Sequence, residues 1–250
     1  LAMHKVRYVG EPVAVVFAED PYVAEDAADL VTMEVEELPP LLDARDDPGE
    51  FSLGRDTEAA ILNQGYGDIE AVFKSAAHVV EVTLTSGRHS GVPLECRGAL
   101  GRYDASRDIL ELHGAAKVPH RNKELLARML NRAPASVQCF ESHVGGGFGI
   151  RGELYPEDVL VCVAAMRLDR PVKWIEDRRE HLIAANHSRN QHHHIKAACT
   201  DEGEILAIDD VIHHDNGAYV RTHATRVAMM TCGVLPGPYR VPGAYRAVCH

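Results

Sequence analysis

The sequence lacks the features that define several classes of protein. Its six cysteines are scattered and none forms a Cys-x-x-Cys pair, so neither a zinc ribbon nor a local iron–sulfur site is encoded. No run approaches the ~18 consecutive apolar residues that a membrane span needs. The formal net charge is -11, which leaves no general basic surface for nucleic acid or for an anionic membrane. We therefore expect no nucleic-acid partner and no membrane span.

The composition that remains is that of a globular protein. Over 250 residues, 46% are hydrophobic and 25% are charged, which suits one large domain or two smaller ones. The first residues show no targeting segment, and we expect a cytoplasmic protein. Leu1 opens directly onto strand-like sequence, and the apolar run at 245–248 is still in progress near His250. Both ends therefore predict a piece of a longer protein.

The first 45 residues follow the pattern of a strand, a helix and a second strand. Residues 13–18 are an uninterrupted apolar run, which is typical of a buried strand. Asp20 and Pro21 predict a capped helix start, and alternation around Met33 and Val35 predicts another strand. Residues 46–75 then mix charges and glycines with few periodic apolar residues. We interpret 1–45 as the end of an α/β domain and 46–75 as a linker.

Residues 76–250 predict a second, α+β domain. Alternating or short apolar runs indicate strands at 78–85, 96–103, 109–112, 136–140 and 172–176. Helical spacing indicates one helix at 120–131 and another that begins at Pro156. Strands near 192–198 and 205–213 form a hairpin around the turn at 201–203. The predicted fold class of the whole chain is α+β.

A glycine-rich segment, Val144-Gly-Gly-Gly-Phe-Gly149, lies between a predicted strand and a predicted helix. Glycine lets a ligand approach the backbone closely, and successive free N–H groups there bind anionic oxygens. A dinucleotide fingerprint would need glycine at Ile150, and a P-loop would need lysine at Glu153, so both motifs fail. A tight turn with a packed Phe148 and a ligand-binding loop both remain open.

The histidines of the predicted hairpin raise the question of a metal site. A turn at Glu202-Gly203 would place His192 opposite His213, close enough to share an ion. An alternative is a solvated hairpin whose imidazoles make ordinary hydrogen bonds. Because third and fourth ligands are missing from the pattern, we assign no metal ligand.

Three other groups of residues are interpreted as structural. The run Arg178-Arg-Glu-His181 predicts a solvated face. Nothing in the sequence activates Cys96 or Cys139 as nucleophiles. Glu95 and Glu153 have no evident acid–base partner in the sequence.

Several segments, in order, resemble the molybdenum-binding large subunit of the xanthine dehydrogenase, aldehyde oxidase and aerobic carbon monoxide dehydrogenase family. The similarity is carried by residues 7–18 with 36–40, 92–98, 144–149, 170–181 and 215–219. Within 92–98, Cys96 stands where the family commonly has proline. The resemblance implies that 1–45 ends a hammerhead-like domain and that 76–250 is the first, truncated cofactor-binding domain.

The resemblance also implies an activity and its cofactors. Family members hydroxylate a carbon of an aldehyde, an N-heterocycle or a similar small molecule, with water as the oxygen source. We expect a molybdopterin-type cofactor in the cytosine dinucleotide form. Phe148-Gly149 match the pair that lies against the molybdenum centre, and Gly146 and Gly147 match the backbone cradle. FAD and iron–sulfur clusters are expected on partner subunits, in a dimer of heterotrimers.

The matched region leaves out part of the family's site and departs from it in places. The glutamate base of the family lies beyond these residues, so no catalytic residue is assigned, and the chain alone is expected to be inactive. Lys117 stands where many members have a glutamine that contacts the cofactor, and we expect it to bind there. Gly152 stands where xanthine-specific members have glutamate, which argues against a purine. A second hypothesis is a non-catalytic scaffold that keeps the fold without molybdenum.

Overall fold

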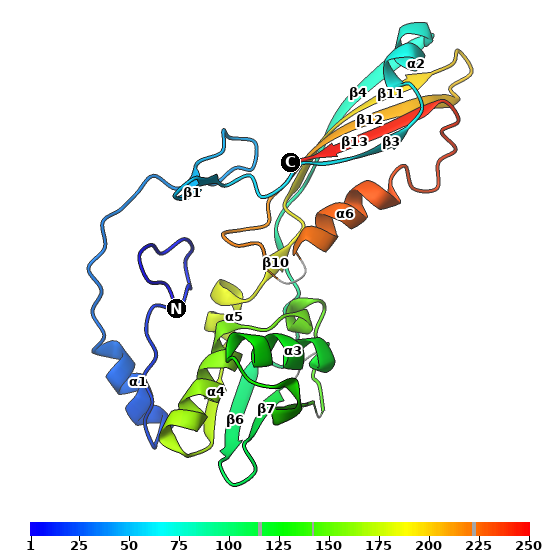
Figure 1. Ribbon diagram of the computed structural model, residues 1–250. Helices are drawn as coiled ribbons and strands as arrows, with labels where there is room; N and C mark the ends of the chain where they lie inside the picture. Colours follow the sequence, from blue (N-terminus) through cyan, green and yellow to red (C-terminus); the bar gives the residue numbers. More distant parts are fainter. Residues whose placement is uncertain (115–116, 142, 222–223) are drawn as a thin grey trace. The chain divides into compact units, whose positions relative to one another are not determined.

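The computed structural model of the chain, shown in Figure 1, describes residues 1–114, 117–141, 143–221 and 224–250. These residues form two compact units. Unit 1 comprises residues 1–38 and 90–187, and unit 2 comprises 39–89 and 188–250. The chain thus leaves unit 1 after its first residues, enters unit 2, and crosses between them twice more.

Unit 1 contains a four-stranded sheet in the order β8-β7-β6-β9. Its strands are β6 (Gly98–Asp104), β7 (Ile109–Gly114), β8 (Val137–Phe140) and β9 (Val172–Ile175). β6 is antiparallel to β7 and β9, whereas β7 and β8 are parallel. A parallel pair needs a crossover, and the chain between β7 and β8 includes α3 (Pro119–Met129) and a 3-10 turn, η1 (Pro134–Ser136).

The core of unit 1 lies between this sheet and two helices, α3 and α4 (Pro156–Leu168). Leu110 and Val137 from the sheet and Leu126 from α3 are fully buried, as is Cys162 from α4. A Cβ on Gly101 of β6 would lie 2.5 Å from the carbonyl oxygen of Val161, so glycine is what allows α4 to approach β6 so closely. This contact fixes α4, whose N-terminal end follows the glycine-rich segment.

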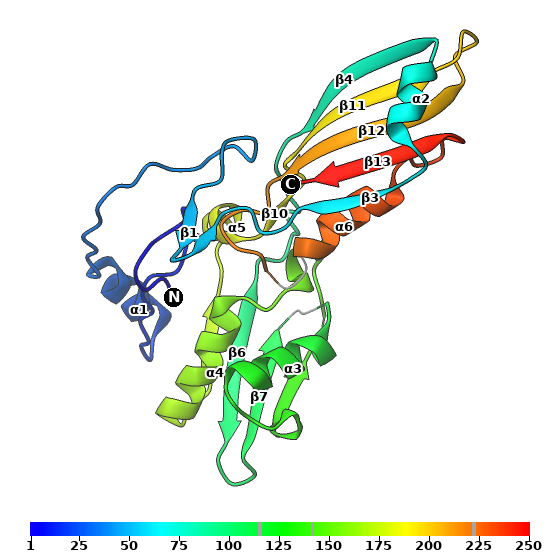
Figure 2. The same cartoon turned by 45° about the horizontal axis from the view of Figure 1, so that its top comes forward.

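Unit 2 is built on a five-stranded sheet in the order β3-β13-β12-β11-β4, seen in Figure 2. Its strands are β3 (Leu62–Tyr66), β4 (His78–Ser86), β11 (Gln191–Cys199), β12 (Ile205–His214) and β13 (Ala244–Cys249). Ala207 of β12 packs in a cluster with Ile69 of α2 (Ile69–Ser75). Ile212 packs with Cys232 of α6 (Ala224–Val234). Residues 207 and 212 point to opposite faces of a strand, so each helix covers a different face of the sheet.

The remaining elements are short. They are α1 (Pro21–Asp29), β1 (Glu50–Ser52), β2 (Arg55–Asp56), β5 (His89–Ser90), η2 (Ile150–Gly152), α5 (Arg178–Ala184) and β10 (His187–Ser188). In the described ranges, no helix has the length and apolar character needed to cross a membrane.

The structure confirms a mixture of helices and sheets, and it corrects parts of the N-terminal interpretation. Helix α1 begins at Pro21, and the Asp20 carboxylate accepts hydrogen bonds from the Tyr22 and Val23 amides, as predicted. The strands predicted at 13–18 and around Met33 are wrong. A strand needs a neighbour to satisfy its backbone, and no described segment pairs with either run.

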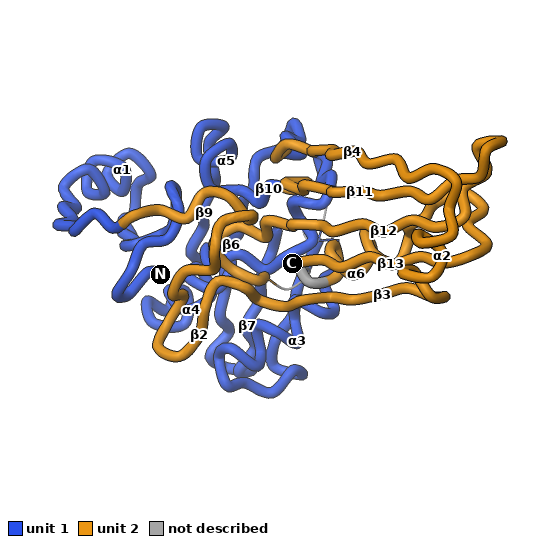
Figure 3. Tube along the Cα trace, turned by 90° about the horizontal axis from the view of Figure 1, so that it is seen from above, with its two compact units in different colours: residues 1–38, 90–187 blue, residues 39–89, 188–250 orange. Residues whose placement is uncertain are grey.

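The segment 46–75 also contains more regular structure than its composition predicts. β1, β2, β3 and α2 all fall within it, and β3 pairs with β13 at an edge of the five-stranded sheet. Figure 3 colours the two compact units along the trace. The domain boundaries at 45 and 75 stay a prediction.

Candidate functional site

The glycine-rich loop between β8 and η2 has an unusual backbone. Gly146, Phe148 and Gly149 have φ values of 103°, 46° and 94°. Gly147 is not among the positive-φ residues. Glycine adopts this region freely, but a bulky residue such as Phe148 does so only under constraint. A Cβ on Gly149 would meet no atom within 4 Å, and the Phe148 side chain is 79% exposed. The loop therefore presents open backbone and an unburied aromatic ring.

Glu95 and Arg151 hold this loop in place. A Glu95 Oε2 atom accepts a hydrogen bond from the Gly145 amide at 2.6 Å, and the Glu95 amide donates to the Gly145 carbonyl at 3.2 Å. Arg151 is 5% exposed; its Nε donates to the Gly146 carbonyl at 2.8 Å. Its Nη2 donates to the carbonyls of Glu95 and Cys96 at 2.7 and 2.8 Å. Glu95 is thus a structural residue, and Arg151 ties the loop to residues 95–96.

Arg97, the next residue in the chain after 95–96, belongs to a buried ion pair. Arg97 donates from Nε and Nη2 to Oε1 of Glu176 at 2.8 and 2.5 Å. Oε2 of Glu176 accepts from the Arg97 amide at 2.9 Å and from Nδ1 of His181 at 2.7 Å. The His181 side chain is fully buried. The pair therefore fixes the start of β6 against the end of β9 and against α5.

The run 178–181 is not the solvated face that its charges predict. Arg178 donates from Nη2 to the carbonyls of Pro93 and Leu94 at 2.7 and 2.8 Å, and His181 turns inward to Glu176. The acceptors of Arg178 lie 85 and 84 residues away in sequence, and the acceptor of His181 is a buried carboxylate five residues away. The prediction is therefore wrong for these two residues.

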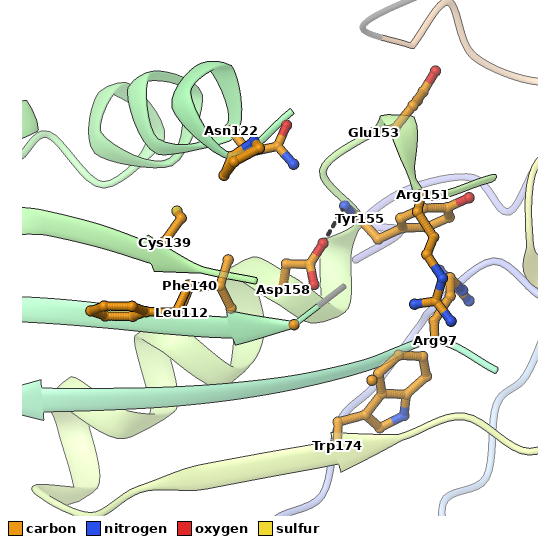
Figure 4. A pocket seen from close by; sticks show the side chains of 13 residues that line it. Arg97, Leu112, Asn122, Cys139, Phe140, Arg151, Glu153, Tyr155, Asp158 and Trp174 are labelled. Carbon is orange, nitrogen blue, oxygen red and sulfur yellow. Dashed lines mark hydrogen bonds between the residues drawn. The ribbon is translucent and has the colours of Figure 1, made fainter. Parts of the chain in front are cut away.

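Arg97 also stabilises the charge of Glu176. Burial by itself would raise the pKa of the Glu176 carboxyl, but hydrogen bonds from the Arg97 side chain and amide outweigh it and lower the pKa. The Arg97 guanidinium lies 3.9 Å from the Tyr155 ring centroid and 5.3 Å from that of Trp174. Figure 4 shows this arrangement beside the cavity. The carboxylate is therefore ionised although it is shielded from water.

A cavity adjoins these residues within unit 1. Its wall includes Arg97, Arg151, Asn122, Cys139, Glu153 and Trp174 (Figure 4). Burial raises the pKa of the Cys139 thiol to about 11, so this sulfur is a neutral thiol and a poor nucleophile near neutral pH. The wall combines charged and polar side chains with apolar ones, which suits a mixed small-molecule surface.

Lys117 lies next to the loop. Its amide donates to the Arg151 carbonyl at 2.9 Å, and its Cδ lies 4.0 Å from the position of a Cβ on Gly152. Its side chain is exposed. The structure thus brings Lys117 and the loop 146–149 into one region of unit 1. Sequence reasoning singled out these residues, but it missed Arg151, because a lone arginine carries no local signal of the carbonyls it will meet.

The histidine hairpin has the predicted register. His192 of β11 is paired with His213 of β12. The His213 ring stacks on that of His250 at 5.3 Å, and its Nδ1 lies 3.3 Å from the Ala44 carbonyl. Across the described ranges, no third side chain places a ligating atom within 4.8 Å of those of both histidines. The pairing of His192 with His213 is confirmed.

Comparison with known proteins connects this geometry to a family. Residues 54–248 match the family model of the molybdopterin cofactor-binding domain. The chain belongs to this family. Among curated relatives, the 6-hydroxypseudooxynicotine dehydrogenase complex subunit gamma of Paenarthrobacter nicotinovorans is 44% identical over 100% of this chain and 32% of that protein. The nicotine 6-hydroxylase large subunit of the same organism is 37% identical over 98% of this chain and 31% of that protein.

Solved structures show the same fold. Quinoline 2-oxidoreductase from Pseudomonas putida 86 superposes with a TM-score of 0.81 at 30% identity, covering 93% of this chain and 30% of that one. The chain thus spans about a third of the length of the relatives it matches. The molybdenum hydroxylase large-subunit resemblance is confirmed.

Proposed function

We propose that this chain is the part of a molybdenum hydroxylase large subunit that forms one wall of the molybdenum cofactor site. The observation that carries the proposal is the loop 146–149. Gly146, Phe148 and Gly149 have positive φ angles, and no atom lies within 4 Å of the Cβ position of Gly149. The Arg151 side chain holds the loop by donating a hydrogen bond to the Gly146 carbonyl. Backbone that a ligand approaches closely needs both features: no side chain in front, and fixed carbonyls and amides. The residues present therefore fit the cofactor that the family binds.

Each residue then has a distinct role. The bound cofactor supplies hydroxylation of a carbon centre with oxygen from water. The backbone of Gly146, Gly147 and Gly149 positions it, and the exposed ring of Phe148 provides an apolar wall that excludes water. Lys117 places a positive charge beside an anionic cofactor. We assign the molybdopterin cytosine dinucleotide form.

The names of the relatives support a proposal for the substrate. Two of them are named for nicotine or a nicotine derivative and a third for quinoline, so we propose an N-heterocycle or an aldehyde as substrate. We also propose FAD and iron–sulfur clusters on partner subunits, assembled as a dimer of heterotrimers. Residues 1–45 would end a hammerhead-like domain, 46–75 would form the linker, and 76–250 would begin the first cofactor-binding domain.

Replacing Gly149 with asparagine tests the cradle. Asparagine tolerates the left-handed region, and the space in front of Gly149 is open, so the chain is expected to fold. The new side chain would occupy the space that the cofactor needs. In the intact enzyme, the molybdenum content measured by elemental analysis should fall roughly 5–150-fold, as expected for an overpacked contact that costs about 1–3 kcal/mol.

The matched control is Gly203→Asn. Gly203 has a φ of 86°, and a Cβ there also meets nothing within 4 Å, but the residue lies at the tip of the β11–β12 hairpin. The Gly203→Asn enzyme should therefore contain as much molybdenum as the wild type. A Gly149→Asn enzyme with full molybdenum and an unchanged Tm would contradict the cradle. A wild-type enzyme that binds no molybdenum would favour the scaffold hypothesis.

Replacing Lys117 tests the charge. Lys117→Met removes an exposed ammonium beside the loop, and a hydrogen bond to a charged group is worth roughly 1.5–3 kcal/mol before solvent screening. Retention of molybdenum during dialysis should therefore fall about 10-fold. Lys117→Gln keeps a hydrogen-bond donor, so its retention of molybdenum should lie between that of the wild type and that of Lys117→Met. The exposed Lys74→Met of α2 is the control. Equal retention in Lys117→Met and the wild type at low ionic strength would contradict this role.

A further inference from the structure

The segment 91–93 packs against the base of the Phe148 side chain. A Cβ on Gly91 would lie 3.0 Å from the Cβ of Phe148 and 3.2 Å from its carbonyl oxygen. A Cβ on Gly146 would lie 3.1 Å from the Cβ of Pro93 and 3.3 Å from Cε2 of Phe148. Two glycines therefore allow the segment and the loop to approach each other closely, beside a ring that is itself exposed.

Strained backbone lies on both sides of this contact. Val92 has a φ of 35° and Phe148 a φ of 46°, a region that β-branched and bulky residues rarely adopt. Such conformations persist only where the surrounding structure holds them, and they cluster at ligand sites. Pro93, which follows Val92, is fully buried. The segment is thus a fixed support for Phe148, and its strain points to a functional role.

Arg178 holds the segment from helix α5. Its Nη2 donates to the carbonyl oxygens of Pro93 and Leu94 at 2.7 and 2.8 Å. The start of α5 is itself fixed by a capping box, in which the Asp177 carboxylate accepts from the Glu180 amide and the Glu180 carboxylate accepts from the Asp177 amide. Because a rigid helix start carries the guanidinium, it fixes the two carbonyls that it contacts.

We propose that Gly91 and Arg178 are positioning residues that act through the segment 91–93 to set the direction of the Phe148 ring. The inference rests on the proposed function, in which this ring lines the site. Aromatic rings pair in offset or edge-to-face geometries, so the direction of the ring decides how well a flat N-heterocycle packs on it. A change at either residue should therefore weaken substrate binding more than it slows the chemical step.

The Gly91→Ala enzyme tests the effect on the substrate. Gly91 is not among the positive-φ residues, so its backbone tolerates alanine, but the new Cβ would displace Phe148. In the intact enzyme, the KM for quinoline, used as a probe, should rise roughly 10-fold, as for one altered apolar contact. The kcat, the molybdenum content and the KM for acetaldehyde, which presents no ring, should change less than about 3-fold.

Two variants control this measurement. Gly87→Ala adds a Cβ that meets no described atom within 4 Å, so its kinetic constants should be those of the wild type. In a Phe148→Gly background the displaced Cβ is absent, so Gly91→Ala should change the KM for quinoline no further. An unchanged quinoline KM in Gly91→Ala, or an equal rise in the KM for acetaldehyde, would overturn the proposal.

Amide hydrogen exchange tests the role of Arg178 on protein without molybdenum. Arg178→Met should speed exchange in a peptide covering 144–150 at least ~10-fold, because a loop that loses its support opens more often. Exchange at the hairpin turn 200–204 should not change. Arg179→Met, at an exposed neighbour, is the control. An unchanged rate at 144–150 in a folded Arg178→Met would rule out its positioning role. A wild-type enzyme without molybdenum would contradict the proposed function alone, since exchange is read without the cofactor.

Discussion

Arg151→Met is expected to destabilise the protein by about 3 kcal/mol or more, because it leaves three backbone carbonyls without a partner at roughly 1–3 kcal/mol each, and to abolish molybdenum retention. Arg151 is 5% exposed and donates to the carbonyls of Gly146, Glu95 and Cys96. Methionine fills a similar volume but donates nothing, so three carbonyls lose their partner in a site with little access to water. Glu95, 3.1 Å from the guanidinium, would lose its counterion.

Arg102→Met separates this effect from the loss of an arginine in general. Arg102 lies on β6 and is 58% exposed at its side chain, with Glu111 3.6 Å away. Exposed pairs contribute ~0–1 kcal/mol, so this variant should unfold in urea close to the wild-type midpoint and keep its molybdenum. Arg151→Met with an unchanged unfolding midpoint would contradict the role of Arg151. Full molybdenum in a destabilised variant would show that the loop does not need this anchor.

The sequence predicts well those parts of the fold that depend on local patterns. Helical spacing located α3 and α4, and the turn at Glu202-Gly203 fixed the register that pairs His192 with His213. Register follows from turn position, because each residue has one partner once the turn is set. The glycine-rich loop was visible for the same reason: three glycines in a row are a local signal.

The supports of the loop were not predictable in this way. Arg151 and Glu95 are 56 residues apart, and Arg178 and Pro93 are 85 apart. Periodicity reports which face of an element is apolar, but not which distant carbonyl a buried guanidinium will meet. For the same reason the charges at 178–181 indicated a solvated face, although His181 is buried. The run at 13–18 predicted a strand from hydrophobicity alone, which does not provide a pairing partner.

Substitutions of Arg97 and Glu176 should have strongly non-additive effects on the free energy of unfolding. Both side chains are buried, with Arg97 6% and Glu176 2% exposed. Arg97→Met or Glu176→Leu alone leaves the other charge buried without its partner, which costs about 3–5 kcal/mol. The double variant removes both charges and replaces them with apolar atoms, so its cost should be well below the sum of the single costs. Urea unfolding of the four proteins measures the coupling, and additive changes in the free energy of unfolding would contradict it.

The same pair predicts a pH dependence with a definite sign. The Glu176 pKa is lowered in the folded protein because the Arg97 hydrogen bonds outweigh the burial that would raise it. A carboxyl with a lower pKa in the folded than in the unfolded chain stabilises the fold above its unfolded-state pKa. That contribution is lost as the pH falls through the folded-state pKa.

Glu176→Gln has no such carboxyl. The difference in the free energy of unfolding between this variant and the wild type, its stability deficit, should therefore be constant near neutral pH and should shrink in acid. Asp43→Asn, in an exposed pair with Arg45, serves as the control and should show a small deficit at every pH. A Glu176→Gln deficit that grows as the pH falls would mean that Glu176 is protonated in the folded protein, and the ion pair with Arg97 would then be wrong.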